Sequence, residues 1–138
     1  MPTAKLTLTS ADIAGDPVNV NKTSNCYKAD STTPLDETAG LNKIILTTTT
    51  NKILYLATAG GDNKAAKIYI CNKSTTPSEY VTITINAQDI GKLYAGDWMF
   101  MPWSQTDTAA QIEIQASVAT AMPIEYMLMH EGYDLANA

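Results

Sequence analysis

The stretch EYVTITIN (79–86) alternates strictly between apolar and polar side chains. Val81, Ile83 and Ile85 are aliphatic, whereas the residues between them are tyrosine or threonine. Because successive side chains of a β-strand point to opposite sides of its sheet, this pattern predicts a strand with one buried and one solvated face. The stretch QIEIQASV (111–118) repeats the alternation and predicts a second strand of the same kind.

Other short runs of β-type residues, bounded by turn residues, surround these two stretches. They are LNKIILTTTT (41–50), KILYLA (52–57), KIYICN (67–72), WMFMPW (98–103) and IEYMLMH (124–130). The glycine-bearing TAGGDNKA (58–65) is expected to be a hairpin loop between two of them. Regularly spaced short strands predict an all-β fold, namely an antiparallel β-sandwich or jelly-roll-like domain of seven to eight strands.

Length and composition agree with a single all-β domain. Of the 138 residues nineteen are threonine, and β-branched residues favour strands over helices. No segment shows three turns of helical periodicity. We expect residues 41–131 to form the sandwich, residues 1–40 to form an irregular N-terminal arm, and residues 132–138 to form a C-terminal tail. Within the arm, KLTLT (5–9) could pair as an edge strand.

The charge pattern argues against binding to nucleic acids or anionic membranes. All nine basic residues are lysines, arginine is absent, and the formal net charge is −5. Nucleic-acid binding normally uses a positive patch that includes arginine side chains. No apolar run approaches the ~20 residues that cross a bilayer, and the N-terminus lacks the apolar core of a secretory signal. We therefore expect a soluble protein that is synthesised in a cytoplasm.

Metal and disulfide chemistry have little support in the sequence. Cys26 and Cys71 show no metal-binding spacing; we interpret Cys71 as a buried free thiol, with a disulfide to Cys26 as the alternative. Zinc binding would need more than one histidine. Calcium is the remaining candidate, because Asp62, Asn63 and Asp107 lie in predicted loops, but no EF-hand spacing is present. We expect no cofactor.

The sequence offers few candidate catalytic residues. His130 is the only histidine, so a Ser-His or Cys-His pair would have to use it, and no nucleophile signature accompanies it. A histidine at the end of an apolar strand is usually a hydrogen-bonded structural residue. Glu125 and Glu131 flank His130. A pair of catalytic carboxylates of the glycosidase type is therefore an open alternative, although no pattern in the sequence points to one. We expect a protein that is not an enzyme.

The segment WMFMPW (98–103) is apolar on both sides of the strand that it predicts. In an extended strand Trp98, Phe100 and Pro102 share one side, and Met99, Met101 and Trp103 share the other. Either the strand is buried on both sides, or one side meets another chain. Met127 and Met129, on the opposite face from Ile124, Tyr126 and Leu128, raise the same question. The interface candidates are Trp98, Met99, Met101, Trp103, Met127 and Met129.

A set of short motifs lies between about Leu41 and His130. Its positions are Cys71, Asn72, Val81 to Ile85, Gly96, Asp97, Pro102, Ile112, Ala116 and Ser117. In these motifs the chain resembles small accessory virion proteins of tailed bacteriophages. The resemblance implies a capsid decoration (cement) or head-fibre protein with a sandwich or jelly-roll-like fold and no catalytic site. The first forty residues depart from the pattern of these proteins and leave open whether an arm contacts a neighbouring subunit. The concentration of Trp, Phe and Met is also higher than that pattern leads us to expect.

Two functional hypotheses follow from these observations. The first is a non-enzymatic virion protein on the capsid surface that stabilises a bacteriophage capsid by contacts with the major capsid protein, other virion proteins or further copies of itself. Several strands are apolar on both faces, and one sandwich interior cannot bury all of these side chains. This excess favours assembly with other subunits. The alternative is a carbohydrate- or receptor-binding β-sandwich module of a phage fibre or tail, in which Trp98 or Trp103 provides a flat platform for a sugar ring.

Overall fold

The structure is a computed structural model that describes residues 1–12, 15, 17–57, 64–105 and 110–131. These residues form antiparallel β-sheets and contain no helix, so this part of the chain holds no helix that could cross a membrane. The predicted all-β, antiparallel sandwich is confirmed. The strands are β1 (Thr3–Ser10), β2 (Val18–Asn25), β3 (Glu37–Thr38), β4 (Asn42–Leu46), β5 (Lys52–Leu56), β6 (Ala66–Asn72), β7 (Tyr80–Ile85), β8 (Gln88–Tyr94), β9 (Trp98–Pro102), β10 (Gln111–Ala116) and β11 (Met122–His130).

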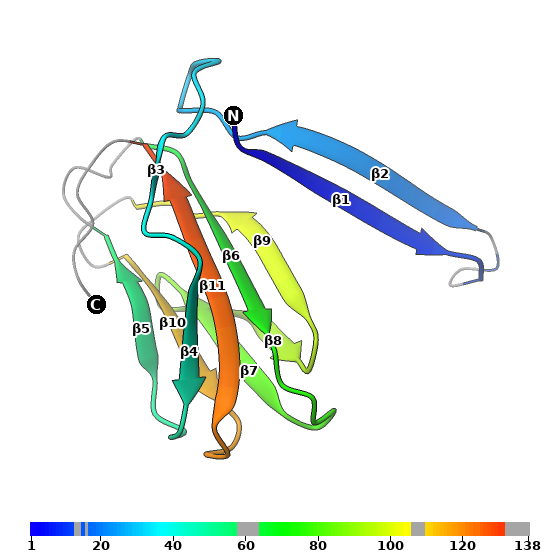
Figure 1. The fold of residues 1–138 in the computed structure, drawn as a ribbon, viewed down its shortest axis with the longest axis vertical. Helices are drawn as coiled ribbons and strands as arrows, with labels where there is room; N and C mark the ends of the chain where they lie inside the picture. The colour runs from blue at the N-terminus through cyan, green and yellow to red at the C-terminus, as the bar shows by residue number, and fades with distance from the viewer. Residues whose placement is uncertain (13–14, 16, 58–63, 106–109, 132–138) are drawn as a thin grey trace.

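Two packed sheets form the sandwich (Figure 1). The first has the order β5-β10-β7-β8, and the second has the order β3-β11-β6-β9, with β4 also paired to β11. From β4 to β11, each strand lies in the opposite sheet from the one before it, except for the neighbours β7 and β8. This winding, in which a ribbon of strands folds over on itself, is compatible with a jelly roll.

The core lies between the two sheets, where the alternating strands point their aliphatic side chains. Val81, Ile83 and Ile85 of β7 are all buried, as the alternation predicts. On the neighbouring β10, Ile112 and Ile114 are completely buried. Ile68, Ile70, Ile124 and Leu128 from the second sheet close the core from the other side.

The hairpin predicted at 58–65 is wrong. Residues 58–63 of that loop lie outside the described residues, but the strands on either side of it, β5 and β6, belong to different sheets. A two-residue hairpin instead joins β7 to β8 at Asn86 and Ala87, which have φ angles of +52° and +64°. Two positive φ angles are typical of the type I′ turn, whose twist matches that of paired strands. Sequence patterning missed it because alanine rarely adopts this conformation.

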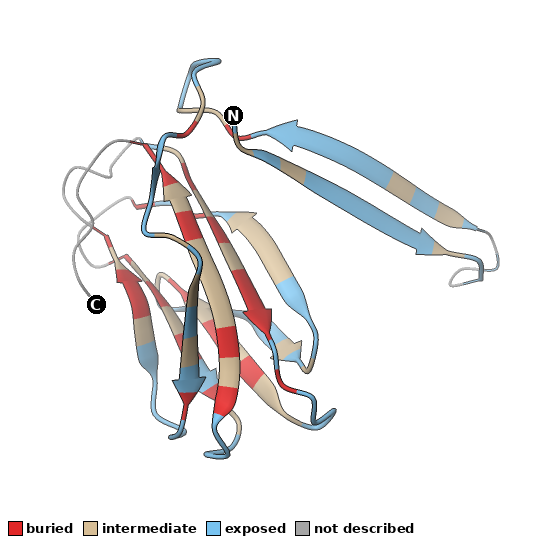
Figure 2. Ribbon diagram, viewed as in Figure 1, coloured by how far each residue is buried: buried red, intermediate tan, exposed pale blue. Residues whose placement is uncertain are grey.

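The predicted N-terminal arm, residues 1–40, contains the two-stranded hairpin β1–β2 and also the short edge strand β3, which pairs with β11 of the sandwich. β1 pairs with β2 along its whole length, from Thr3 opposite Asn25 to Ser10 opposite Val18, and neither strand joins the sandwich sheets. Figure 1 shows the hairpin leaving the top of the sandwich and extending away from it, and Figure 2 shows that most of it is exposed. KLTLT (5–9) is a strand as predicted, but its partner is VNVNKTSN (18–25), whose asparagines and lysine argued for a loop.

Candidate functional site

The outer surface of the second sheet is mainly apolar, although the register also places the charged side chains of Lys67 and Glu125 on it. Its six central residues come from three neighbouring strands, and we call them the outer apolar face. They are Tyr69 and Cys71 on β6, Trp98 and Phe100 on β9, and Met127 and Met129 on β11. Their strand neighbours Ile68, Ile70 and Leu128 point into the core. Large apolar side chains therefore lie on both sides of this sheet.

Strand register arranges the outer apolar face in rows. Tyr69 lies opposite Met127 on one side and Phe100 on the other, so one row crosses three strands. In the next row Cys71 lies between Trp98 and Glu125, and in the row on the other side Lys67 lies between Pro102 and Met129. Cross-strand neighbours of this kind have Cβ atoms about 4.5–5.5 Å apart, close enough for the side chains to form one continuous surface.

The outer surface of the first sheet has the opposite character. Thr82 of β7 lies between Gln115 of β10 and Lys92 of β8, and Thr84 lies opposite Glu113. The Lys92 ammonium lies 4.5 Å from the centre of the Tyr80 ring, which also contacts Tyr94. This sheet is the one with a solvated face, as the alternation of 79–86 predicts. The two outer surfaces of the sandwich are thus chemically different.

The predicted interface residues do not all lie on the outer apolar face. Trp98 is 53% exposed there, and Met127 and Met129 are half-buried beside it. Met99 and Met101 point inward, opposite Ile70 and Ile68, and pack against the core. Trp103 is only 2% exposed and belongs to the core. Its proposal as an interface residue is therefore corrected, because an indole that is already buried in its own fold offers no surface to a partner.

Tyr69 and Phe100 are members of the face that the candidate set missed. Phe100 is two residues from Trp98 in the same strand, so strand alternation already placed it on the same side. Tyr69 lies between the two buried residues Ile68 and Ile70, which signals an outward side chain. Strand alternation thus places both residues on the outer side, and the candidate set omitted them because it kept only tryptophan and methionine.

The phenol of Tyr69 is the polar group at the centre of this face. Its Oη donates a hydrogen bond to the Glu125 carboxylate at 2.9 Å. Burial raises the pKa of Tyr69, and the hydrogen bond to Glu125 raises it further, so the phenol keeps its proton. A surface that covers this pair must also desolvate the Glu125 carboxylate, which costs free energy unless the covering surface offers it a further donor.

A groove of about 260 Å³ separates the hairpin from the sandwich. One wall is formed by the hairpin and the other by Trp98 and Phe100 of β9; the hairpin residues are Ala4, Lys5, Leu6, Lys22 and Ser24. The base of the hairpin and the outer apolar face therefore face each other without being in close packing.

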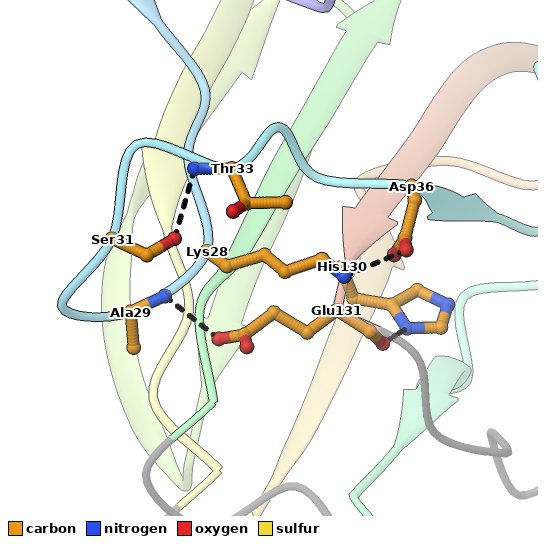
Figure 3. A network of polar contacts seen from close by, with 7 residues as sticks. All are labelled: Lys28, Ala29, Ser31, Thr33, Asp36, His130 and Glu131. Carbon is orange, nitrogen blue, oxygen red and sulfur yellow. Dashed lines mark hydrogen bonds and ion pairs between the residues drawn. The ribbon is translucent and has the colours of Figure 1, made fainter.

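The base of the hairpin is attached to the end of β11 by a polar network (Figure 3). The Glu131 carboxylate accepts hydrogen bonds from the backbone N–H groups of Ala29, at 2.9 Å, and Ala65. Lys28 forms an ion pair with Asp36 at 2.7 Å. His130 is buried, and its Nδ1 lies 2.6 Å from the carbonyl oxygen of Glu131. His130 thus has the hydrogen-bonded structural setting that the sequence suggested.

Acid is expected to loosen this attachment. Burial by itself raises the pKa of Glu131, but the two backbone N–H donors and the charges of Lys64 and Lys28 outweigh it and lower the pKa below its usual range. A carboxylate with a lowered pKa in the folded state adds stability above its unfolded pKa of about 4.3, and this contribution is lost as the pH falls through the folded value. Hydrogen exchange at the Ala29 and Ala65 amides should therefore accelerate below about pH 4.

The matched variant for this prediction is Glu131→Gln, which keeps a carbonyl acceptor but not the charge. We expect it to lower the free energy of unfolding at pH 7 by about 1–2 kcal/mol, because charge-assisted hydrogen bonds become neutral ones. Thermal melts from pH 7 to pH 3 should show a smaller loss of stability for the variant than for the natural chain. Equal pH dependence in the two proteins would contradict the role of this carboxylate.

The cysteines do not pair, and the described residues offer no metal cluster. Cys26 and Cys71 are both free and buried, so the disulfide alternative is wrong. No group of three histidine, cysteine, aspartate or glutamate side chains within the described ranges could hold a metal ion. The calcium candidates Asp62, Asn63 and Asp107 lie outside those ranges.

A scan against protein-family models and a search of curated proteins found no match to this sequence. We therefore infer function from the chemistry of the outer apolar face and from the attachment of the hairpin.

Proposed function

We propose that the protein is a non-enzymatic structural protein of a virion, which decorates and stabilises a bacteriophage capsid through protein–protein contacts. The observation that carries this proposal is the outer apolar face, with Trp98 53% exposed at its edge, on a sandwich whose opposite outer surface is polar. The resemblance of residues 41–130 to small accessory virion proteins supplies the setting. The proposed partners are the major capsid protein, other virion proteins and further copies of this chain.

The mechanism would be burial of apolar surface at subunit boundaries. Each square ångström of apolar surface that leaves water contributes about 25 cal/mol, and this gain exists only in the assembled state. Tryptophan, methionine and tyrosine are enriched in the cores of interfaces, and all three occur in the outer apolar face. The net charge of −5 keeps free copies apart in solution.

Trp98→Thr tests the proposal. We expect the variant to lose at least tenfold in affinity for capsids, because the largest exposed ring of the face is removed while a β-branched residue keeps the strand. Its free energy of unfolding should change by less than about 1 kcal/mol, since the side chain is half in solvent. The measurement is co-sedimentation of the purified protein with capsids, together with a denaturation curve.

The control is Tyr94→Thr, which removes another exposed ring, 43% exposed, from the end of β8 in the polar sheet. This variant should bind capsids as the natural chain does. Equal loss of binding in both variants, or loss only together with global unfolding, would count against an interaction through the outer apolar face.

A carbohydrate- or receptor-binding module is the second candidate, and the exposure of Trp98 is the observation that favours it. An indole face of this kind can stack on a sugar ring, and the Tyr69–Glu125 pair lies in the neighbouring strands. The burial of Trp103 removes it as a platform. Quenching or a blue shift of Trp98 fluorescence by oligosaccharides, abolished in Trp98→Thr, would favour this function over capsid binding.

A further inference from the structure

The β1–β2 hairpin is amphipathic. Its register places one set of cross-strand pairs on each side, and all of its aliphatic side chains fall on the same side. We call that side the hairpin apolar face; its apolar members are Ala4, Leu6, Leu8, Val18 and Val20, and it also carries Ser10, Lys22 and Ser24. The other side carries threonine, asparagine and lysine throughout. A ribbon with this pattern is built to lay one side on another apolar surface.

The hairpin apolar face is uncovered in the single chain. Leu6 is 42% and Leu8 54% exposed, and β1 and β2 pair only with each other. A two-stranded hairpin is marginally stable in water without a third layer. Its length and its side-chain pattern therefore call for a covering surface.

The hairpin is held away from the sandwich of its own chain. At its base the Cys26 N–H donates to the Pro2 carbonyl and the Leu35 N–H donates to the Cys26 carbonyl, both at 2.9 Å. Cys26 and Leu35 are 1% and 5% exposed, and the adjoining Ala29 is bound to Glu131. Closing the hairpin onto its own sandwich would disturb this buried base.

We propose that the hairpin is an exchange arm, which lays the hairpin apolar face of one copy on the outer apolar face of a second copy while the second copy does the same in return. This inference rests on the proposed function and narrows it: of the partners proposed above, a further copy of the chain is the one that covers the outer apolar face. One chain carries both complementary surfaces, so a pair of copies covers all four at once. The groove between Leu6 and Trp98 marks where the arm of the second copy enters.

The area is adequate for a stable pair. Eight residues per strand at ~3.4 Å each give a ribbon roughly 27 Å long, and two strands make it about 10 Å wide. Reciprocal exchange hides four such surfaces, with a flat footprint on the order of 1,000 Å². Because side chains protrude from the strands, the solvent-accessible area that is buried exceeds this flat footprint. It therefore reaches the range of stable interfaces, ~1,200–2,000 Å² in total.

Sedimentation velocity of the full chain over a concentration series tests the exchange. We expect the natural protein to sediment as a dimer and Leu8→Asp to weaken the dimer at least tenfold, since its carboxylate would be desolvated in the contact. Thr7→Asp is the matched control: it adds the same charge one residue away, on the polar side of the same strand, and should leave the dimer intact. A monomeric natural chain, or equal effects of both substitutions, would overturn the proposal.

Crosslinking identifies the surfaces directly. A chain with Leu8→Cys is mixed with a chain with Met127→Cys, both in a Cys71→Ala background, and oxidised. We expect the mixture to form more intermolecular disulfide than either chain alone. A disulfide that forms within a single chain carrying both substitutions, at a rate independent of concentration, would overturn the exchange and assign the hairpin to its own sandwich.

The two proposals fail separately. If the natural chain is a monomer but Trp98→Thr detaches it from capsids, the exchange is wrong and the capsid role stands. If the chain is an arm-exchanged dimer that ignores capsids, the capsid role is wrong and the exchange stands.

Discussion

Trp103→Ala is expected to lower the free energy of unfolding by about 3–5 kcal/mol, the usual cost of truncating a fully buried large aromatic side chain. The indole is 2% exposed and belongs to the core between the sheets. Its Nε1 donates to Asn86 Oδ1 at 3.0 Å, and the same oxygen accepts from the Gln111 N–H at 3.1 Å. Removing the ring therefore opens a cavity. It also removes one of the two hydrogen bonds to Asn86 that connect the end of β9 and the start of β10 to the β7–β8 turn.

Chemical denaturation of Trp103→Ala and Trp98→Ala gives the measurement and its control. The two substitutions delete the same side chain from positions five residues apart, and only the buried one should lose several kcal/mol; the exposed one should lose about 1 kcal/mol or less. Capsid association should follow the reverse order when measured below both unfolding midpoints. Similar stability losses at the two positions would contradict the assignment of one tryptophan to the core and the other to the outer apolar face.

Asn72→Ala is expected to lower the free energy of unfolding by about 2–4 kcal/mol, because it removes the partners of one buried and one partly buried backbone group. Asn72 is completely buried. Its Nδ2 donates to the Leu93 carbonyl and its Oδ1 accepts from the Ser74 N–H, both at 2.9 Å. Its own backbone pairs with Gly96 and Asp97 in the connection from β8 to β9.

The connection from β8 to β9 sets the position of β9, so the loss of the Asn72 side chain should also disturb the outer apolar face. Gly96 has a φ angle of +84° in the connection, and Trp98 follows two residues later. We expect Asn72→Ala to lower the melting temperature and to weaken capsid association as well, whereas the same change at the exposed Asn51 should do neither. Unchanged stability of Asn72→Ala in a denaturant titration would rule out a structural role for its side chain.

The strands of the sandwich could be read from local patterns. The alternation at 79–86 and 111–118 placed Val81, Ile83, Ile112 and Ile114 in the core, where the structure has them. The prediction that alternate side chains of 98–103 lie on opposite sides of the strand is also confirmed, with Trp98 and Phe100 on one side and Trp103 on the other. These predictions succeed because the direction of a strand side chain depends only on its position along the strand.

The sequence could not show which side of WMFMPW is inside. Both sides are apolar, so burial depended on which strand pairs with β9; the buried Ile68 and Ile70 of β6 bring Met99 and Met101 inward with them and leave Trp98 and Phe100 outside. The hairpin prediction at 58–65 failed for a related reason, because β5 and β6 are neighbours in sequence but pair with β10 and with β9 and β11. Pairing is a long-range choice that turn residues do not encode.

The sequence by itself thus determined the class of fold and the two faces of each strand, since both follow from the period of two in an extended chain. Only the tertiary structure decided that the outer apolar face lies on one sheet alone and that β1 and β2 form an arm beside it. The physical reason is that a face becomes a surface only when strands from distant parts of the chain are paired in a definite register, and that register is set by packing of the whole domain.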